Sequence, residues 1–258
     1  MTCYFTPEAV EQLHANKAEL RDKLHRLRES YISYSFSNER AREFANHGFC
    51  RRVGMLIRSI DVVFEQLPPE LDEIPAHNEV DDATIAIQSF LMNTYGCLDN
   101  LAWIWVHEAG IRHPNGSEIA RKRVGLLSPI IKQSLPGSFQ SYLDSRQDWF
   151  EHVKDFRDSL AHRIPLYIPP FMVSSEHANE YQRLDSALFE ALRNGDLNTC
   201  DNIRTEQRRF TFFRPWMTHS FSENAPKVIF HSQILNDGLT IDEIGRVSLR
   251  ELASNGRS

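Results

Sequence analysis

The chain has 258 residues, of which 41% are hydrophobic and 25% are charged. This length and composition suffice for one domain with a sizeable buried core. A formal net charge of −6 excludes a basic surface over the whole molecule, so any contact with RNA or DNA must be local.

No apolar run approaches the ~20 residues that a membrane-spanning helix needs, and residues 1–11 do not resemble a signal peptide. The four cysteines (Cys3, Cys50, Cys97 and Cys200) are far apart and form no C-x-x-C pair. We therefore expect a cytoplasmic protein with free thiols and no membrane contact.

The first predicted helix begins at Thr6-Pro7-Glu8, where a hydroxyl N-cap precedes a proline and an acid. A heptad stripe follows it, made of Val10, Leu13, Leu20, Leu24, Leu27 and Tyr31. The stripe predicts packing on the core of this protein or on a second copy of the chain.

A second helix is predicted over residues 39–66, ending before Pro68-Pro69, and a loop over residues 67–78. The third helix is expected to be capped by Asn78 or Asp81 and to reach Ala109, with Gly110 as its stop. It is apolar on more than one side, which predicts a place in the middle of a bundle. The residues that indicate this are Ile85, Phe90, Leu91, Leu98, Leu101, Trp103, Ile104 and Trp105.

Residues 112–136 predict a basic loop with a short helix around 117–127. A long helix is then predicted over 140–164, because its apolar residues recur at helical spacing. These residues are Leu143, Phe150, Val153, Phe156, Leu160 and Ile164. Pro165, Pro169 and Pro170 forbid its continuation.

A helix over residues 176–193, ended by Asn194-Gly195, opens the carboxy-terminal part. Residues 209–221 and 227–231 are rich in aromatic residues, Thr and Val, and the turn at 222–226 joins them into a predicted β-hairpin segment over 209–231. A final helix is predicted over 240–253. The chain is therefore expected to be a single, mostly α domain: an antiparallel helical bundle with a small β-hairpin appendage.

The best candidate active-site motif is Arg157-Asp158-Ser159-Leu160-Ala161-His162, at the end of the helix predicted over 140–164. Asp158 and His162 are four residues apart and face each other across one helical turn. Arg157 and His162 are about 140° apart around an ideal helix and share no narrow face. Arg157 therefore needs a groove, or a second chain, to meet the group that His162 meets.

These residue types suit the cleavage of a phosphodiester. Histidine titrates near pH ~6.5 and can exchange protons at neutral pH. Arginine stays charged and can hold phosphate oxygens in a bidentate manner. Asp158 could hydrogen-bond the imidazole of His162 and fix its tautomer.

The motif resembles the R-[N/H/D]-x-x-x-H signature of the HEPN superfamily, and Arg157, Asp158 and His162 match its three defined positions. The helix around Tyr95–Ala102 also looks like the helix beside the motif in that family, so the resemblance covers roughly residues 80–165. It implies a HEPN-like helical core over about 39–165, completed by the helix at 240–253.

The resemblance also implies an activity: a metal-independent endoribonuclease in which the RNA 2′-hydroxyl attacks the neighbouring phosphate. It implies a homodimer in which the catalytic Arg and His come from two protomers, with no cofactor and no metal. A toxin or antiphage-defence role, with an antitoxin or other partner protein, is its further implication. The alternatives are a non-catalytic HEPN-like module that binds RNA or protein, and an unrelated helical protein in which the string is accidental.

Two polar residues, Asp99 and Asn100, lie within the apolar third helix, where unpaired polar groups are costly. We expect that one of them supports Arg157 or His162 from the neighbouring helix. The alternative is that each is a core residue with its own partners.

Basic clusters at Arg121-Lys122-Arg123 and at Arg51-Arg52 could contact an RNA backbone, or could be solvated surface. Arg121-Lys122-Arg123 is the more suggestive cluster, because it lies between the two central helices. His107-Glu108 and His113 lack the H-E-x-x-H spacing, so no metal site is expected there.

Overall fold

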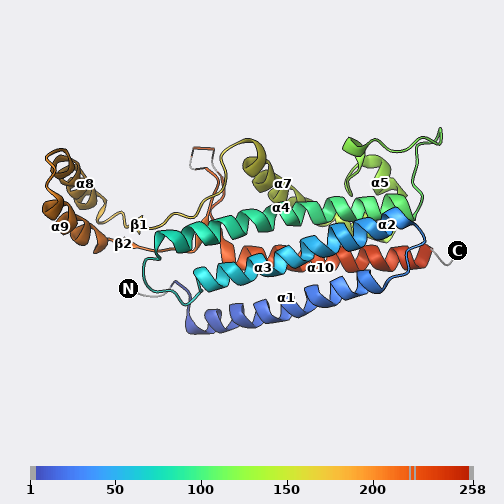
Figure 1. The fold of residues 1–258 in the computed structure, drawn as a ribbon, viewed down its shortest axis with the longest axis horizontal. Helices are drawn as coiled ribbons and strands as arrows, with labels where there is room; N and C mark the ends of the chain where they lie inside the picture. Colours follow the sequence, from blue (N-terminus) through green and yellow to red (C-terminus); the bar gives the residue numbers. More distant parts are fainter. Residues whose placement is uncertain (1–3, 221, 224, 256–258) are drawn as a thin grey trace.

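The computed structural model describes residues 4–220, 222–223 and 225–255 and is mostly helical. Four long helices lie side by side in an elongated bundle (Figure 1): α1 (Pro7–Ser33), α3 (Cys50–Gln66), α4 (His77–Glu108) and α10 (Phe230–Asn255). Cys3, and Phe221 and Asn224 of the predicted hairpin segment, lie outside the described residues.

Helix α1 begins as the sequence predicts, because the Thr6 hydroxyl accepts a hydrogen bond from the Ala9 N–H at 3.3 Å. Its stripe faces α3 and α10, and the buried positions are Leu13, Leu20, Leu24, Leu27 and Tyr31. The Tyr31 hydroxyl donates to the Gly245 carbonyl on α10 at 2.8 Å. The heptad stripe is therefore occupied by the core of this chain and gives no support to a dimer.

The helix predicted over 39–66 occurs as three joined pieces: α2 (Glu39–Glu43), the π-helical turn η1 (Phe44–Phe49) and α3. Asn38 caps α2 by accepting from the N–H groups of Arg40 and Ala41. The π turn brings Gly48 so close to α4 that a Cβ on this residue would lie 2.7 Å from Asn100 Nδ2. Such wide turns are common at functional sites.

Helix α4 is central, because it contacts α3, α7 and α10. It begins at His77, before both predicted caps, and the Ala76 N–H donates to the Glu79 carboxylate at 2.7 Å. Most of its predicted apolar residues are buried. Ile85 is an exception, with 64% of its surface exposed.

Two predictions for the middle of the chain are wrong. The predicted helix at 117–127 is only the 3₁₀ turn η2 (Arg121–Arg123), and α5 (Pro129–Ser134) follows it. The helix predicted over 140–164 is broken at residues 145–146 into α6 (Gly137–Asp144) and α7 (Gln147–His162). The break gives α6 and α7 different partners on α10, since Tyr142 bonds to Glu243 whereas Trp149 bonds to Asp237.

Helices α8 (Ala178–Arg193) and α9 (Leu197–Arg208) form a helical hairpin that projects beyond one end of the bundle (Figure 1). Helix α8 ends at Asn194-Gly195 as predicted, and Gly195 has a positive φ of 68°. Helix α9 was not predicted. It is capped by the Asp196 side chain, which accepts from the Thr199 N–H at 3.1 Å.

The prediction of one β-hairpin over 209–231 is only partly right. Strand β3 (Trp216–Met217) does pair antiparallel with β4 (Val228–Ile229), but β2 (Thr211–Phe212) pairs antiparallel with β1 (Met172–Val173). Pro215 separates β2 from β3, and a proline cannot donate to a strand ladder.

Helix α10 begins at Phe230, ten residues before the predicted start. The sequence Asn236-Asp237-Gly238 indicates a turn, yet it lies within the helix. A Cβ on Gly238 would lie 2.9 Å from Leu20 Cδ2, so the glycine serves the close approach of α1 and α10. The bundle therefore includes α1 and all of α10 in addition to the predicted core over 39–165 and 240–253.

None of the described helices is long and apolar enough to cross a membrane. Cys50, Cys97 and Cys200 are buried free thiols, in agreement with the prediction for these three residues.

Candidate functional site

The motif lies on the last turn and a half of α7, which packs on α4. Phe150, Val153 and Phe156 bury the inner face of α7, and the buried Ser159 hydroxyl donates to the Phe156 carbonyl at 2.7 Å. Arg163 ends the helix with φ −130° and ψ −133°. Packing of the apolar stripe thus leaves the motif's polar side chains at an accessible helix end.

Arg157 lies against α4 rather than in open solvent. Its guanidinium carbon is 4.1 Å from the centroid of the Tyr95 ring, and its Nη1 donates to Asp158 Oδ1 at 2.7 Å. Only 27% of its side chain is exposed. A cation over an aromatic face within ~6 Å is attracted by the ring quadrupole, so Tyr95 holds Arg157 at the surface of α4.

His162 is exposed at the final residue of α7. Within the described part of the chain, no hydrogen bond joins it to Asp158, whose carboxylate is bonded to Arg157 instead. The expected Asp158–His162 pair is therefore not formed in this protomer, because the adjacent guanidinium competes for the carboxylate. His162 is free to meet a substrate or a second chain.

A second arginine lies beside the motif, although the sequence indicated only a surface basic pair there. Arg52 on α3 is half-buried, and its Nε donates to Asn100 Oδ1 at 2.9 Å. Its Nη1 donates to Asn93 Oδ1 at 3.2 Å. The guanidinium lies so close to Gly96 that a Cβ there would be 2.3 Å from Nη1. The predicted role of Asn100 is thus partly resolved: within this protomer it binds Arg52.

Asp99 lies near both arginines. Burial raises its pKa, and the charges of Arg157 and Arg52 act in the opposite direction. Both guanidiniums therefore act electrostatically on this carboxyl, and the predicted supporting role of Asp99 stays a prediction. Arg52, Asp99, Asn100 and Arg157 form the polar cluster of α3, α4 and α7, and this name is kept below.

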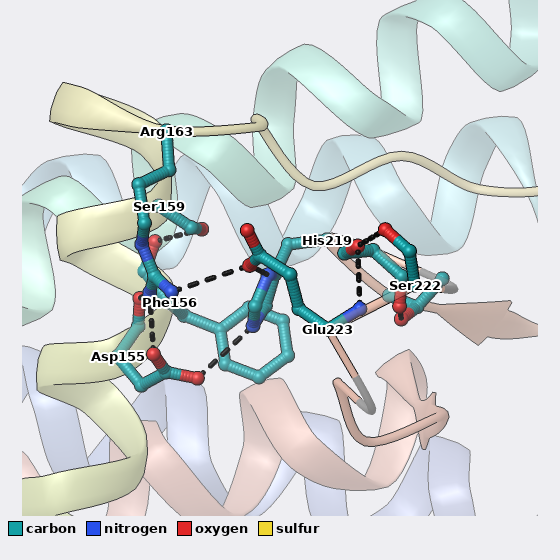
Figure 2. A network of polar contacts seen from close by, with 9 residues as sticks. Asp155, Phe156, Ser159, Arg163, His219, Ser222 and Glu223 are labelled. Atoms are coloured by element: carbon teal, nitrogen blue, oxygen red, sulfur yellow. Dashed lines mark hydrogen bonds and ion pairs between the residues drawn. The ribbon is translucent and has the colours of Figure 1, made fainter.

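A network that the sequence did not indicate anchors the end of α7 (Figure 2). Asp155 accepts from Arg163 Nη2 and is 3.0 Å from Nε2 of the buried His219. Glu223 approaches the same pair, with Arg163 Nη1 at 3.3 Å from its Oε2. Arg163 and His219 lower the pKa of Asp155, against the opposing effect of burial. The network fixes the backbone directly after His162.

The basic cluster Arg121-Lys122-Arg123 is exposed, but it lies away from the motif. Arg121 lines a cavity of about 180 Å³ together with Trp103 and His107. Trp103 follows Tyr95 on α4 by more than two turns, so Arg121 and Arg157 occupy different parts of that helix.

No metal-ligand cluster of three His, Cys, Asp or Glu side chains occurs within the described residues. The Glu108 carboxylate instead accepts from the N–H groups of Ser37 and Asn38, at 2.7 and 3.1 Å.

Comparisons with known proteins give no match: no family model, no curated protein and no solved structure is similar to this chain.

Sequence reasoning did not predict the contact of Tyr95 with Arg157 or the contact of Arg52 with Asn100, and it missed the network of Asp155, Arg163 and His219. Gly96 was an available signal, since a glycine within a long helix indicates the close approach of another group. His219 carried no signal, because its partners come from a helix 64 positions earlier in the chain.

Proposed function

We propose that this protein is a HEPN-like endoribonuclease that cleaves RNA without a metal ion. The observation that carries the proposal is that Arg157 and His162 lie at an accessible helix end beside the polar cluster. Its second cation, Arg52, would add to a local positive field in a chain of net charge −6. Cytoplasmic action as a toxin or defence component, controlled by an antitoxin or other partner protein, is part of the same proposal.

In the proposed reaction the RNA 2′-oxygen attacks the adjacent phosphorus, and the bond to the 5′-oxygen breaks. The attacking hydroxyl loses its proton and the leaving oxygen gains one, and His162 is the group placed for this exchange. The products are a 2′,3′-cyclic phosphate and a 5′-hydroxyl end. Arg157 would stabilise the charge on the non-bridging oxygens.

A homodimer would complete this site. Arg157 faces Tyr95, whereas His162, exposed at the helix end, has no partner among the residues that the structure describes. Ile164, 45% exposed, follows the motif directly, and Met92, 44% exposed, lies three residues before Tyr95 on α4. These side chains could bury apolar surface against a second copy.

We expect purified protein to cleave mixed RNA in the presence of EDTA. His162→Ala should lower the rate by ~10²–10⁴-fold, because it removes the proton-transferring group. His25→Ala, at an exposed position on α1, is the matched control and should leave the rate unchanged. Equal cleavage by wild type and His162→Ala, or strict dependence on a divalent metal, would refute the mechanism.

A non-catalytic module is the second candidate, and one observation favours it. The Arg157 guanidinium is already stacked on Tyr95 and paired with Asp158, as in an arginine that serves only to hold α7 on α4. If the protein is such a module, the Arg157→Ala/His162→Ala double variant keeps its function in cells. If the protein is a ribonuclease, the same double variant loses it.

A further inference from the structure

A second concave site lies at the N-terminal end of α4, away from the part of α4 that contacts the motif. It is an open pocket of about 710 Å³, between the first residues of α4, the segment after Pro170 and the α8–α9 hairpin. This volume is within the ~300–1,000 Å³ of typical small-molecule sites. His77, in its wall, precedes Tyr95 by 18 positions, or ~27 Å of helix. The pocket is therefore separate from the motif.

Two guanidiniums line the pocket, together with the carboxylates of Glu73 and Glu79. Arg204 and Arg208 are four residues apart on α9 and both line the pocket. Arg204 has only a long contact with Asp201, at 3.7 Å, and no ion pair within the described part of the chain includes Arg208. The N-terminal end of the 32-residue α4 lies in the same wall, where the Glu79 carboxylate accepts from the Ala76 N–H at 2.7 Å.

The other lining groups suit a planar ring and a sugar. Phe171 and Tyr181 both line the pocket, with ring centroids 6.1 Å apart, and 39% of Phe171 is exposed. The Glu73 carboxylate can accept hydrogen bonds from hydroxyl groups. Gln207, only 6% exposed, also lines the pocket, and among the described residues its Nε2 has no hydrogen-bond acceptor.

We propose that this pocket binds a nucleoside 5′-phosphate. Arg204 and Arg208 hold the phosphate, Phe171 and Tyr181 contact the base, and Glu73 accepts from the ribose hydroxyls. The same chemistry is offered by a free nucleotide and by the 5′-phosphorylated end of an RNA chain. The pocket does not depend on the proposed ribonuclease activity.

The direct test is calorimetric titration of the full-length protein with adenosine 5′-monophosphate and, separately, with inorganic phosphate. We expect saturable binding of the nucleotide and much weaker binding of phosphate. Arg204→Ala/Arg208→Ala should weaken nucleotide binding by about tenfold or more, since charge-assisted hydrogen bonds are lost. Phe171→Ala should weaken it by about fivefold or more, through lost stacking.

The matched control is Arg193→Ala/Arg209→Ala, which removes two exposed arginines of the same hairpin region outside the pocket and should bind normally. His162→Ala should also bind normally, so failure of the ribonuclease proposal would not affect this result. Binding that survives the loss of Arg204 and Arg208, or phosphate binding as tight as nucleotide binding, would overturn the assignment.

The source of the ligand is determined by comparing the binding of two oligoribonucleotides of the same sequence, one with a 5′-phosphate and one with a 5′-hydroxyl. Preference for the phosphorylated chain over adenosine 5′-monophosphate identifies an RNA end, and the reverse order identifies a free nucleotide. Absence of saturable binding by both the mononucleotide and the phosphorylated chain would refute the proposal.

Discussion

Arg157 and His162 differ in how many interaction partners the described residues provide for their side chains. Arg157 has an aromatic ring beneath it and a carboxylate beside it, whereas His162 has neither within the described part of the chain. Within the six-residue motif, the Arg157 side chain is therefore held in position and the His162 side chain is not. The proposal of a site shared between two chains starts from this asymmetry, and it can be tested residue by residue.

Mixing two inactive variants tests whether the site is shared. If each site takes Arg157 from one chain and His162 from the other, a mixed dimer of Arg157→Ala with His162→Ala contains one intact site. We expect partial recovery of RNA cleavage after the two proteins are unfolded together and refolded. If the mixture of the two variants stays inactive and activity returns only when wild-type chain is added, both residues act within one protomer.

At the scale of elements, the contact of η1 and α3 with α4 is set by small residues. Gly48 admits Asn100 and Gly96 admits Arg52, so the polar cluster fits between two helices that otherwise pack apolar faces. Intrinsic propensity opposes glycine within a helix by about 1 kcal/mol relative to alanine. The glycines are consequently explained by what lies against them.

Gly96→Ala should destabilise the protein even though alanine is the better helix former. The new Cβ displaces the Arg52 guanidinium from Asn93 and Asn100, and the net loss should be roughly 1–3 kcal/mol. Urea unfolding measures the change. Gly125→Ala, in open space, is the control and should be near neutral. A stabilised Gly96→Ala protein would show that the contact contributes nothing.

The contact between α7 and α10 contains a buried carboxyl group. Burial raises the pKa of Asp237 to about 7, although hydrogen bonds from Trp149 and Gln233 lower it. The folded protein thus binds this proton more tightly than the unfolded chain, in which aspartate titrates near ~3.9. The stability that it contributes is complete below pH ~4 and is lost as the pH rises through about 7.

Asp237→Asn should flatten this dependence, because the amide stays neutral at every pH. We expect the difference in unfolding free energy between pH 6.5 and pH 8 to shrink in the variant, as measured by urea unfolding. This range avoids the buried His231, whose pKa is lowered to about 4 and which acts on the acid side. Asp22→Asn, at an exposed position on α1, should retain the dependence of the wild type. Identical curves for all three proteins would show that Asp237 does not titrate between pH 6.5 and pH 8.

At the scale of the whole molecule, the α8–α9 hairpin is structurally independent of the bundle. Its buried apolar residues, Leu184, Ala191 and Cys200, do not belong to the main core. Its helices contact each other and β2. Figure 1 shows the hairpin beyond the end of the bundle. Because Val173 and Thr211 are paired, the two ends of the hairpin region lie next to each other.

Replacing residues 176–209 with a short Gly-Ser linker should therefore leave the bundle folded. We expect the Tm to change by less than about 4 °C, which corresponds to about 1 kcal/mol for a chain of this size. Scanning calorimetry measures it. The shortened protein should lose nucleotide binding, since the pocket loses Arg204 and Arg208. A much larger fall in Tm would show that the hairpin supports the core.

The sequence by itself determined the helical class, the start of α1, the central position of α4 and the motif at a helix end. Each of these depends on local patterns: a cap, a periodicity of apolar residues, or a proline that stops a helix. Interactions between distant residues decided the rest. Gly238 lies within α10 because α1 approaches it closely at Leu20. The break between α6 and α7 goes with their separate hydrogen bonds to Glu243 and Asp237 on α10.

The same distinction applies to the site. Residue types and spacing identified Arg157 and His162, because chemistry at a helix end is readable from six positions. Only the tertiary structure placed Tyr95 under Arg157, Arg52 beside Asp99, and His219 behind the last turn of α7. Those contacts join residues 47 to 64 positions apart, and packing of the helices, rather than any local pattern, brings them together.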